Sequence, residues 1–153
     1  MEQPDEPGRI VFHGIRDEHG YLSNFWPAPI TLKGVVWPTS EHYFQAQKFA
    51  ETAHEEAIRR VASPMIAARM GRSRARPLRP DWDAIKESVM LDALRAKFTQ
   101  HPDLAERLRA TGDASLVERN ARDAYWADGK DGHGLNRLGN LLMRVRAELR
   151  GAG

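Results

Sequence analysis

The sequence predicts a mainly α-helical fold with a minor β-hairpin near the N-terminus. About six segments carry helix start and stop signals, such as a serine or threonine before an apolar run and a glycine after it. Two β-prone runs, Ile30–Leu32 and Val35–Trp37, flank the two-residue turn Lys33-Gly34. The strand–helix alternation of a dinucleotide fold is missing, and so are the phosphate-loop and serine-elbow motifs. A compact, single-domain, multihelical fold follows from these observations.

Composition narrows the class of protein. With 153 residues the chain suits one domain, which we expect to span residues 10–150 after a flexible leader of residues 1–9. Hydrophobic residues make up 41% and charged residues 29%, a globular balance. The chain has no cysteine, which excludes disulfides and thiol catalysis, and no apolar run long enough for a membrane span. We therefore expect a cytoplasmic protein, and its net charge of +2 is too small to indicate nucleic-acid binding by itself.

The elements follow one another in a simple order. A short strand is expected at residues 10–13, then a polar and aromatic loop at 21–27, and then the hairpin. Helices are predicted after the N-caps Thr39, Thr52, Ser63 and Asp81, after His101, and from Leu135. Their expected ends are near Phe49, Ala62, Gly71, Phe98, Thr111 and Leu149, with a short extended piece at Leu116-Val117.

The helix that starts after Thr39 has an unusual pattern. Glu41, Phe44, Gln45 and Lys48 fall on one arc of roughly 100°, and the other sides are almost entirely aromatic or apolar. This pattern is typical of a buried helix whose polar stripe lines a cavity, because buried charges are costly unless they are paired or used. Structural ion pairs are the alternative, although Glu41 and Lys48 are too far apart along the helix to pair as i,i+4 partners.

Two further groups of residues have both a functional and a structural interpretation. Basic residues crowd into one segment without an intervening acid, which fits either a phosphate-binding patch or a solvated surface; they are Arg69, Arg72, Arg74, Arg76 and Arg79. Loop aromatics lie beside polar residues and can sandwich a planar base, or can serve only as hydrophobic lids; they are Phe25 and Trp26 after Asn24, Trp82 after Asp81, and Trp126 after Asp123.

Metal chemistry has little support in the sequence. The six histidines show no ligand spacing, and His42 on the aromatic helix is best interpreted as a hydrogen-bonded core histidine. We expect neither a metal nor a cofactor.

Several blocks in a consistent order resemble the NADAR (NAD and ADP-ribose) superfamily, also called the YbiA-like family, over residues 12–149. The blocks are residues 22–25, Trp37 to Phe49, Asp81-Trp82-Asp83, Ala96-Lys97-Phe98, Thr111-Gly112-Asp113, Asp123-Ala124-Tyr125-Trp126 and residues 134–143, which include Asn136. One position departs from the family pattern, because Ala127 stands where a glycine usually follows the tryptophan. If that glycine adopts a positive φ or lets a ligand approach closely, Ala127 is expected to carry a cost.

The resemblance implies a helical N-glycosidase that cleaves a ribose N-glycosidic bond in a nucleotide-like small molecule or in ADP-ribosylated nucleic acid. Two substrate classes stay open: ADP-ribosylated guanine and ribosylamino-pyrimidine phosphates of the riboflavin pathway. Such a bond breaks through an oxocarbenium-like sugar, which a carboxylate can stabilise and a desolvated lysine can attack. The expected catalytic residues are Lys48, Glu41 and Asp123, and the expected substrate-binding residues are Asn24, Phe25, Trp82, Trp126, Asn136, Arg74 and Arg76.

We expect Glu41, Lys48, Trp82, Asp123 and Trp126 to converge on one cleft. Lys97 is the competing lysine, ranked second because a cation at the end of a long helix already has a structural explanation. Two rival functions stay open. A non-catalytic ADP-ribose-binding or NAD-binding module would bind without turnover, and an arginine-rich nucleic-acid-binding domain would show salt-dependent affinity. The sequence leaves the oligomeric state unknown.

Overall fold

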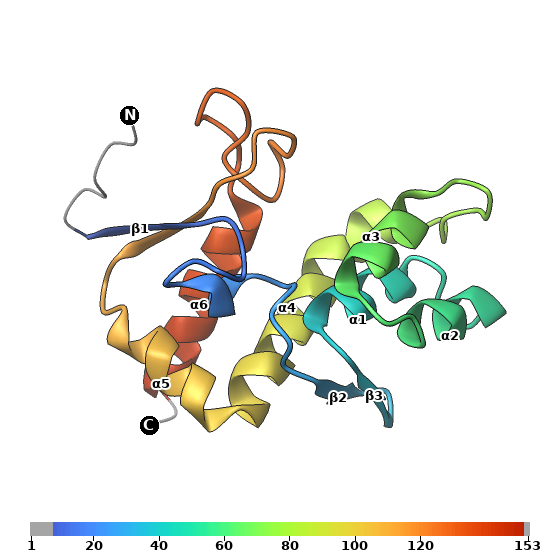
Figure 1. The fold of residues 1–153 in the computed structure, drawn as a ribbon, viewed down its shortest axis with the longest axis horizontal. Coiled ribbons are helices and arrows are strands. Elements are labelled where there is room, and N and C mark those ends of the chain that lie inside the picture. The colour runs from blue at the N-terminus through green and yellow to red at the C-terminus, as the bar shows by residue number, and fades with distance from the viewer. Residues whose placement is uncertain (1–7, 152–153) are drawn as a thin grey trace. The chain divides into compact units, whose positions relative to one another are not determined.

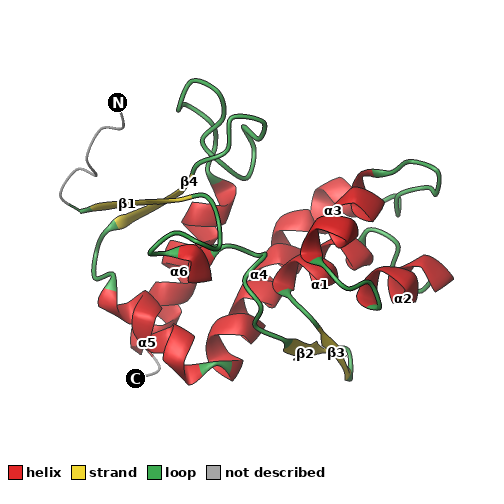
Figure 2. Ribbon diagram, in the orientation of Figure 1, coloured by secondary structure: helices red, strands yellow, loops and turns green. Residues whose placement is uncertain are grey.

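The computed structural model describes residues 8–151 and is mainly helical (Figures 1 and 2). The described residues contain six α-helices and two small sheets of two strands each. Packing divides the described residues into two units, the α1 unit of residues 24–100 and the terminal unit of residues 8–23 with 101–151. Most of the predicted leader lies outside the described residues, and β1 (Arg9–Phe12) begins at the last residue assigned to it.

The α1 unit opens with the predicted hairpin. Strands β2 (Ile30–Leu32) and β3 (Val35–Trp37) pair antiparallel, with Ile30 opposite Trp37. Lys33 and Gly34 both have a positive φ, 57° and 77°, which a type I′ turn requires. The Trp37 indole donates a 2.9 Å hydrogen bond to the Leu32 carbonyl and thereby closes the hairpin. This hairpin leads the chain directly to the N-cap of the next helix.

Helix α1 (Ser40–Gln47) is the buried helix that the sequence predicted. The Thr39 hydroxyl accepts from the His42 amide at 3.2 Å, so Thr39 is the N-cap. All eight helical residues are buried, including every polar one. The helix ends earlier than expected, with Lys48 at its C-cap. Helices α2, α3 and α4 all pack on α1, which places its polar stripe inside the unit (Figure 1).

Helix α2 (Ala53–Arg59) is shorter than predicted. The expected capping box is wrong in detail, because Thr52 accepts from the His54 amide, while the Glu55 carboxylate accepts from Glu51 and from Lys33. Helix α3 (Pro64–Arg72) starts as expected, with the Ser63 hydroxyl accepting from the Ile66 amide. Its end was misplaced, because Gly71 lies within the last turn and not after it.

Helix α4 (Trp82–Gln100) is the longest helix among the described residues and runs two residues beyond its expected end. Asp81 precedes it, but its carboxylate pairs with the Arg79 guanidinium at 2.7 Å. Lys97 lies in the last turn of α4, where the sequence placed a cation near the last carbonyls. Its side chain is fully buried, and burial lowers its pKa to about 7.

The terminal unit holds a strand pairing that the sequence did not reveal. Strand β1 pairs in parallel with β4 (Ser115–Glu118), in the register Arg9 opposite Ser115. A 3₁₀ turn (Gly20–Leu22), α5 (Pro102–Ala110) and α6 (Arg137–Gly151) complete the unit. Helix α6 starts two residues later than predicted because Asn136 has a φ of 51°, and Leu135, the expected first residue, is half exposed.

Candidate functional site

Lys48 lies at the end of the polar stripe of α1 in a largely apolar setting. Only 7% of the residue is exposed. Its ammonium nitrogen lies 5.8 Å from the centre of the Phe44 ring and 6.0 Å from that of the Trp82 ring. Its hydrogen bond to the Gly71 carbonyl is long at 3.4 Å. A buried amine with such a weak acceptor is poorly compensated for the hydration that it has lost.

This environment changes the acidity of Lys48. Burial is the main reason that its pKa is lowered to about 8. The positive charge of Arg74 acts in the same direction, the Glu41 carboxylate opposes it, and Arg72 adds a smaller lowering effect. With a pKa near 8, roughly a quarter of the side chains are neutral at about pH 7.5, compared with roughly one in a thousand for an ordinary lysine. The amine is therefore available as a nucleophile near neutral pH.

Glu41 and Gln45 occupy the same stripe one turn apart. Both are buried, and the Gln45 side-chain amide donates to Glu41 Oε2 at 2.8 Å. The i,i+4 spacing of the two residues made this contact available from the sequence, but Gln45 was not among the predicted site residues. Gly71 was also missed, because it was assigned to a helix end. Its carbonyl is the acceptor for Lys48.

The arginine segment reaches the site at one position. Arg74 is exposed, and its guanidinium donates to the Gly71 carbonyl at 2.8 Å, the same oxygen that Lys48 contacts. Arg76 is also exposed, and its charge lowers the pKa of His54, after the larger effect of burial. Arg79 is bound to Asp81 and to the Gln47 carbonyl. Arg74 is thus the arginine of this segment that shares an acceptor with Lys48.

Trp82 belongs to the same cluster as Lys48. It is the first residue of α4, it is 6% exposed, and its ring contacts Phe44 at 5.2 Å between centroids and an angle of 55°. Within the α1 unit, Glu41, Lys48 and Trp82 therefore lie together as expected. The convergence of the full predicted set stays a prediction, because Asp123 and Trp126 belong to the terminal unit.

Asn24 has a structural task. Its side-chain oxygen accepts from the Ser40 hydroxyl at 2.8 Å, and its nitrogen lies 3.3 Å from the Met90 sulfur. Its carbonyl also accepts from the Glu41 amide at 3.2 Å, so Asn24 anchors the first turn of α1. Phe25, next to it, is half-buried. The expected contact of Asn24 and Phe25 with a substrate stays a prediction.

The loop before α6 is shaped by Asp123. One carboxylate oxygen of Asp123 accepts from the amides of Tyr125 at 3.0 Å and Trp126 at 2.8 Å. The Trp126 ring is half-buried and meets the Tyr125 ring edge-on, at 5.0 Å. Ala127 is fully buried and has no positive φ, so the expected backbone strain at this position is absent.

Asn136 links the same loop to strand β4. Its side-chain nitrogen donates to the Leu116 carbonyl at 2.9 Å, and its oxygen accepts from the Glu118 amide at 3.1 Å. Both ends of the amide are therefore engaged within the protein. A substrate contact from Asn136 stays a prediction.

His42 is the hydrogen-bonded core histidine that the sequence suggested. It is fully buried, with Nε2 3.0 Å from the Val61 carbonyl and Nδ1 2.8 Å from the Thr39 hydroxyl. A carbonyl can only accept, so Nε2 carries the proton and Nδ1 accepts from Thr39. Burial lowers the pKa of His42, which keeps the ring neutral.

Comparison with known proteins identifies the family. Residues 11–150 match the NADAR domain model, and the chain belongs to this family. The N-glycosidase YbiA of Escherichia coli K12 is 56% identical over 140 residues, which cover 92% of this chain and 88% of that protein. A riboflavin biosynthesis protein of Vibrio vulnificus is 46% identical over 149 residues, which cover 97% of this chain and 39% of that protein.

A solved structure supports the fold. The NMR structure of the E. coli protein YbiA matches with a TM-score of 0.86 at 55% identity, covering 94% of this chain and 85% of that one. The mainly helical, YbiA-like architecture predicted from the sequence is therefore confirmed. None of the described helices combines the length and apolar composition that a membrane crossing requires.

Proposed function

We propose that the chain hydrolyses the N-glycosidic bond of a ribosylated, nucleotide-like substrate, with Lys48 and Glu41 as its central catalytic groups. The enzyme class follows from the family and from relatives that carry the name N-glycosidase: the protein is a hydrolase of N-glycosyl bonds. Two substrates are proposed, ADP-ribosylated guanine and the ribosylamino-pyrimidine phosphates of riboflavin biosynthesis. A relative named as a riboflavin biosynthesis protein supports the second.

One observation carries the mechanism: a buried lysine with a pKa of about 8 shares a helical stripe with a buried carboxylate. In the proposed reaction the neutral Lys48 amine attacks C1′ of the sugar as the bond to the base breaks. The amine proton leaves with the base, and the sugar stays on Lys48 as a glycosylamine that opens to an imine. Water then hydrolyses the imine and restores the amine. Glu41 stabilises the positive charge that develops on the sugar ring.

The remaining predicted residues complete the proposal. Trp82, Trp126 and Phe25 are proposed to contact the base, Asn24 and Asn136 to fix polar edges, and Arg74 and Arg76 to hold phosphate. Asp123 is the second proposed carboxylate. If Lys48 is not the nucleophile, a water activated by Glu41 or Asp123 is the alternative route. No cofactor or metal is needed for either route, and we propose a cytoplasmic location.

The decisive experiment measures turnover of ADP-ribosylated guanosine and of ribosylamino-pyrimidine phosphates by the purified protein. Release of the free base from either substrate supports the proposal and selects the substrate. Tight binding of ADP-ribose without release of base from any ribosylated substrate would identify a non-catalytic binding module. Borohydride added during turnover should trap the sugar on Lys48, and a peptide map locates the adduct.

A search for polymer substrates uses the same assay. ADP-ribosylated oligonucleotide is compared with the ADP-ribosylated nucleoside at two salt concentrations. A strongly salt-dependent preference for the oligonucleotide supports a nucleic-acid substrate, because phosphate contacts release counterions. Equal rates at both salt concentrations support the small molecule.

A further inference from the structure

Gln45 stands out among the buried side chains around Lys48. It is 6% exposed, and its amide nitrogen donates to Glu41 Oε2 at 2.8 Å. Its amide oxygen is buried and has no hydrogen-bond partner among the residues that the structure describes. Buried polar atoms without a partner are rare, and a methionine of similar size would avoid the cost at this position.

The orientation of this amide is fixed by chemistry. An ionised carboxylate can only accept hydrogen bonds, so the amide nitrogen must face Glu41. Turning the amide over would give the oxygen a different neighbour, but it would bring two oxygens together at Glu41. The unpaired oxygen is therefore the consequence of keeping a donor on Glu41.

Gly71 provides the space for this arrangement. It is buried in the last turn of α3, and its φ is not in the region that favours glycine. A Cβ atom on Gly71 would collide with the Gln45 amide oxygen and would lie 2.6 Å from Gln45 Cδ. Glycine inside a helix is unfavourable, so the close approach to Gln45 explains the glycine.

We infer that Gln45 is a positioning residue that holds the Glu41 carboxylate in one orientation and in its ionised form, and that Gly71 belongs to the same device. The inference rests on the proposed role of Glu41. A carboxylate that stabilises charge on a sugar must be ionised and correctly placed, and a fixed hydrogen-bond donor serves both needs. Gln45 acts through Glu41 and does not itself touch the reacting atoms.

The charged groups near this stripe come from two elements. Lys48, at the C-cap of α1, interacts electrostatically with Glu41, and Arg72 and Arg74, from the end of α3 and the segment after it, act on Lys48. All of these stay in place when Gln45 is replaced, so a change in the titration of Glu41 reports the lost donor.

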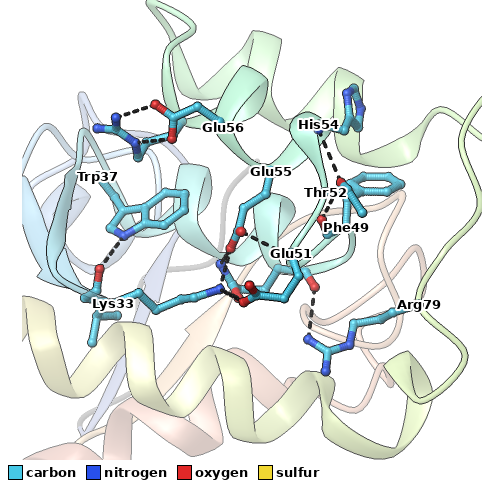
Figure 3. A network of polar contacts seen from close by, with 12 residues as sticks. Lys33, Trp37, Phe49, Glu51, Thr52, His54, Glu55, Glu56 and Arg79 are labelled. Carbon is cyan, nitrogen blue, oxygen red and sulfur yellow. Dashed lines mark hydrogen bonds and ion pairs between the residues drawn. The ribbon is translucent and has the colours of Figure 1, made fainter.

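Gln47 is the matched control. It lies on the same helix and is 4% exposed, but its amide donates to Glu55 at 2.7 Å and accepts from Lys33 at 3.2 Å. Both of these partners are labelled in Figure 3. Gln45→Met and Gln47→Met therefore remove the same chemical group from the same helix. Gln45→Met removes the amide whose oxygen has no partner among the described residues, whereas Gln47→Met removes an amide that is bonded at both ends.

The experiment measures kcat, KM and the pH profile of kcat/KM for both variants on the substrate that the wild type turns over. Gln45→Met should lower kcat by roughly ten- to a hundredfold with little change in KM, because the carboxylate loses its orientation. The acid limb of its profile should move upward by about one pH unit, because a carboxylate that loses a donor binds its proton more tightly. Gln47→Met should lower the melting temperature and leave the kinetic constants and the profile unchanged.

Gly71→Ala extends the experiment. It should reproduce the kinetic defect of Gln45→Met by displacing the amide, and the double variant should be no worse than Gln45→Met alone, since both changes break the same contact. If the losses in kcat multiply in the double variant, Gly71 and Gln45 act independently. A wild-type pH profile in Gln45→Met would overturn the inference.

A titration without substrate separates this inference from the proposed function. Carbon NMR of the Glu41 side-chain carboxyl should show a higher midpoint in Gln45→Met than in the wild type, whether or not any ribosylated substrate is turned over. Unchanged Glu41 midpoints refute the positioning role even if the enzyme is active. A shifted midpoint in a protein without N-glycosidase activity refutes the proposed function and keeps the Gln45–Glu41 link.

Discussion

Two lysines beside α1, Lys33 and Lys48, have opposite environments. Lys33 contacts Glu55 at 2.6 Å, Glu51 at 3.2 Å and the Gln47 amide oxygen at 3.2 Å (Figure 3). Burial acts to lower its pKa, but the hydrogen bonds to Glu55 and Glu51 outweigh this effect and raise it. Lys48 has one long hydrogen bond to a carbonyl and a lowered pKa.

The same contrast separates the two glutamines of α1. Gln47 uses both ends of its amide, whereas the Gln45 oxygen is left without a partner among the described residues. The Lys33 network is therefore organised for stability. Within the described part of the chain, the stripe of Glu41, Gln45 and Lys48 instead contains buried polar groups with weak or missing hydrogen bonds, which lower the stability of the fold. Departures from local energetic rules of this kind are expected at functional sites. Four substitutions, taken in order of decreasing effect, test this contrast.

The largest effect is expected from Lys48→Arg. Arginine keeps the positive charge but has no neutral amine for attack on C1′, so turnover should fall at least about a thousandfold. Rates are measured under single-turnover conditions, and circular dichroism checks that the helices persist. Lys33→Arg is the matched control and should keep near-wild-type activity. An active Lys48→Arg enzyme would favour a carboxylate-activated water instead.

Lys97 extends the comparison to a lysine that is fully buried. Its pKa of about 7 lies below that of an exposed lysine, so between about pH 7 and 10 the unfolded chain binds more protons than the folded one. Stability should therefore rise with pH in this window, by up to about 1.4 kcal/mol per pH unit. Lys97→Met should flatten that rise, measured by urea unfolding at several pH values. An unchanged slope would mean that Lys97 stays charged when buried.

A smaller loss of stability is expected from Lys33→Met. Removal of the ammonium leaves the mostly buried Glu55 carboxylate without its closest cation, which should destabilise the protein by about 1–2 kcal/mol near neutral pH. The Lys33 contact is one of the causes that lower the pKa of Glu55, so its stabilising effect should be lost as the pH falls through the folded-state pKa of Glu55. Thermal unfolding near pH 7 and below pH 4 checks both parts. A loss of activity without a loss of stability would contradict the assignment of this network to stability.

The smallest effect is expected from Arg74→Ala. The Arg74 charge helps to lower the pKa of Lys48, so its removal should shift the rise of activity with pH upward by a few tenths of a pH unit from its midpoint near 8. Arg74→Ala should also weaken the binding of a phosphorylated substrate more than the binding of its unphosphorylated form. Arg76→Ala is expected to share the phosphate effect but not the pH shift. Equal losses on both substrates would place both arginines outside the phosphate site.

The sequence alone determined the local structure around α1. The Thr39 cap, the Lys33-Gly34 turn and the Ser63-Pro64 helix start follow from hydrogen-bonding and φ preferences that act over a few residues. The buried polar stripe was also visible, because aromatic residues on nearly every side of a helix require burial. Ordered motifs across the chain were sufficient to indicate the family.

Which polar groups are satisfied depends on contacts between distant parts of the chain. The pairing of β1 with β4, the full burial of Lys97 and the shared use of the Gly71 carbonyl by Lys48 and Arg74 join residues that are distant in the sequence. A helical pattern gives the direction of a side chain but not the atom that it meets. For that reason the sequence could place Gln45 beside Glu41, but it could not show that one end of the amide would be bonded and the other left without a partner among the described residues.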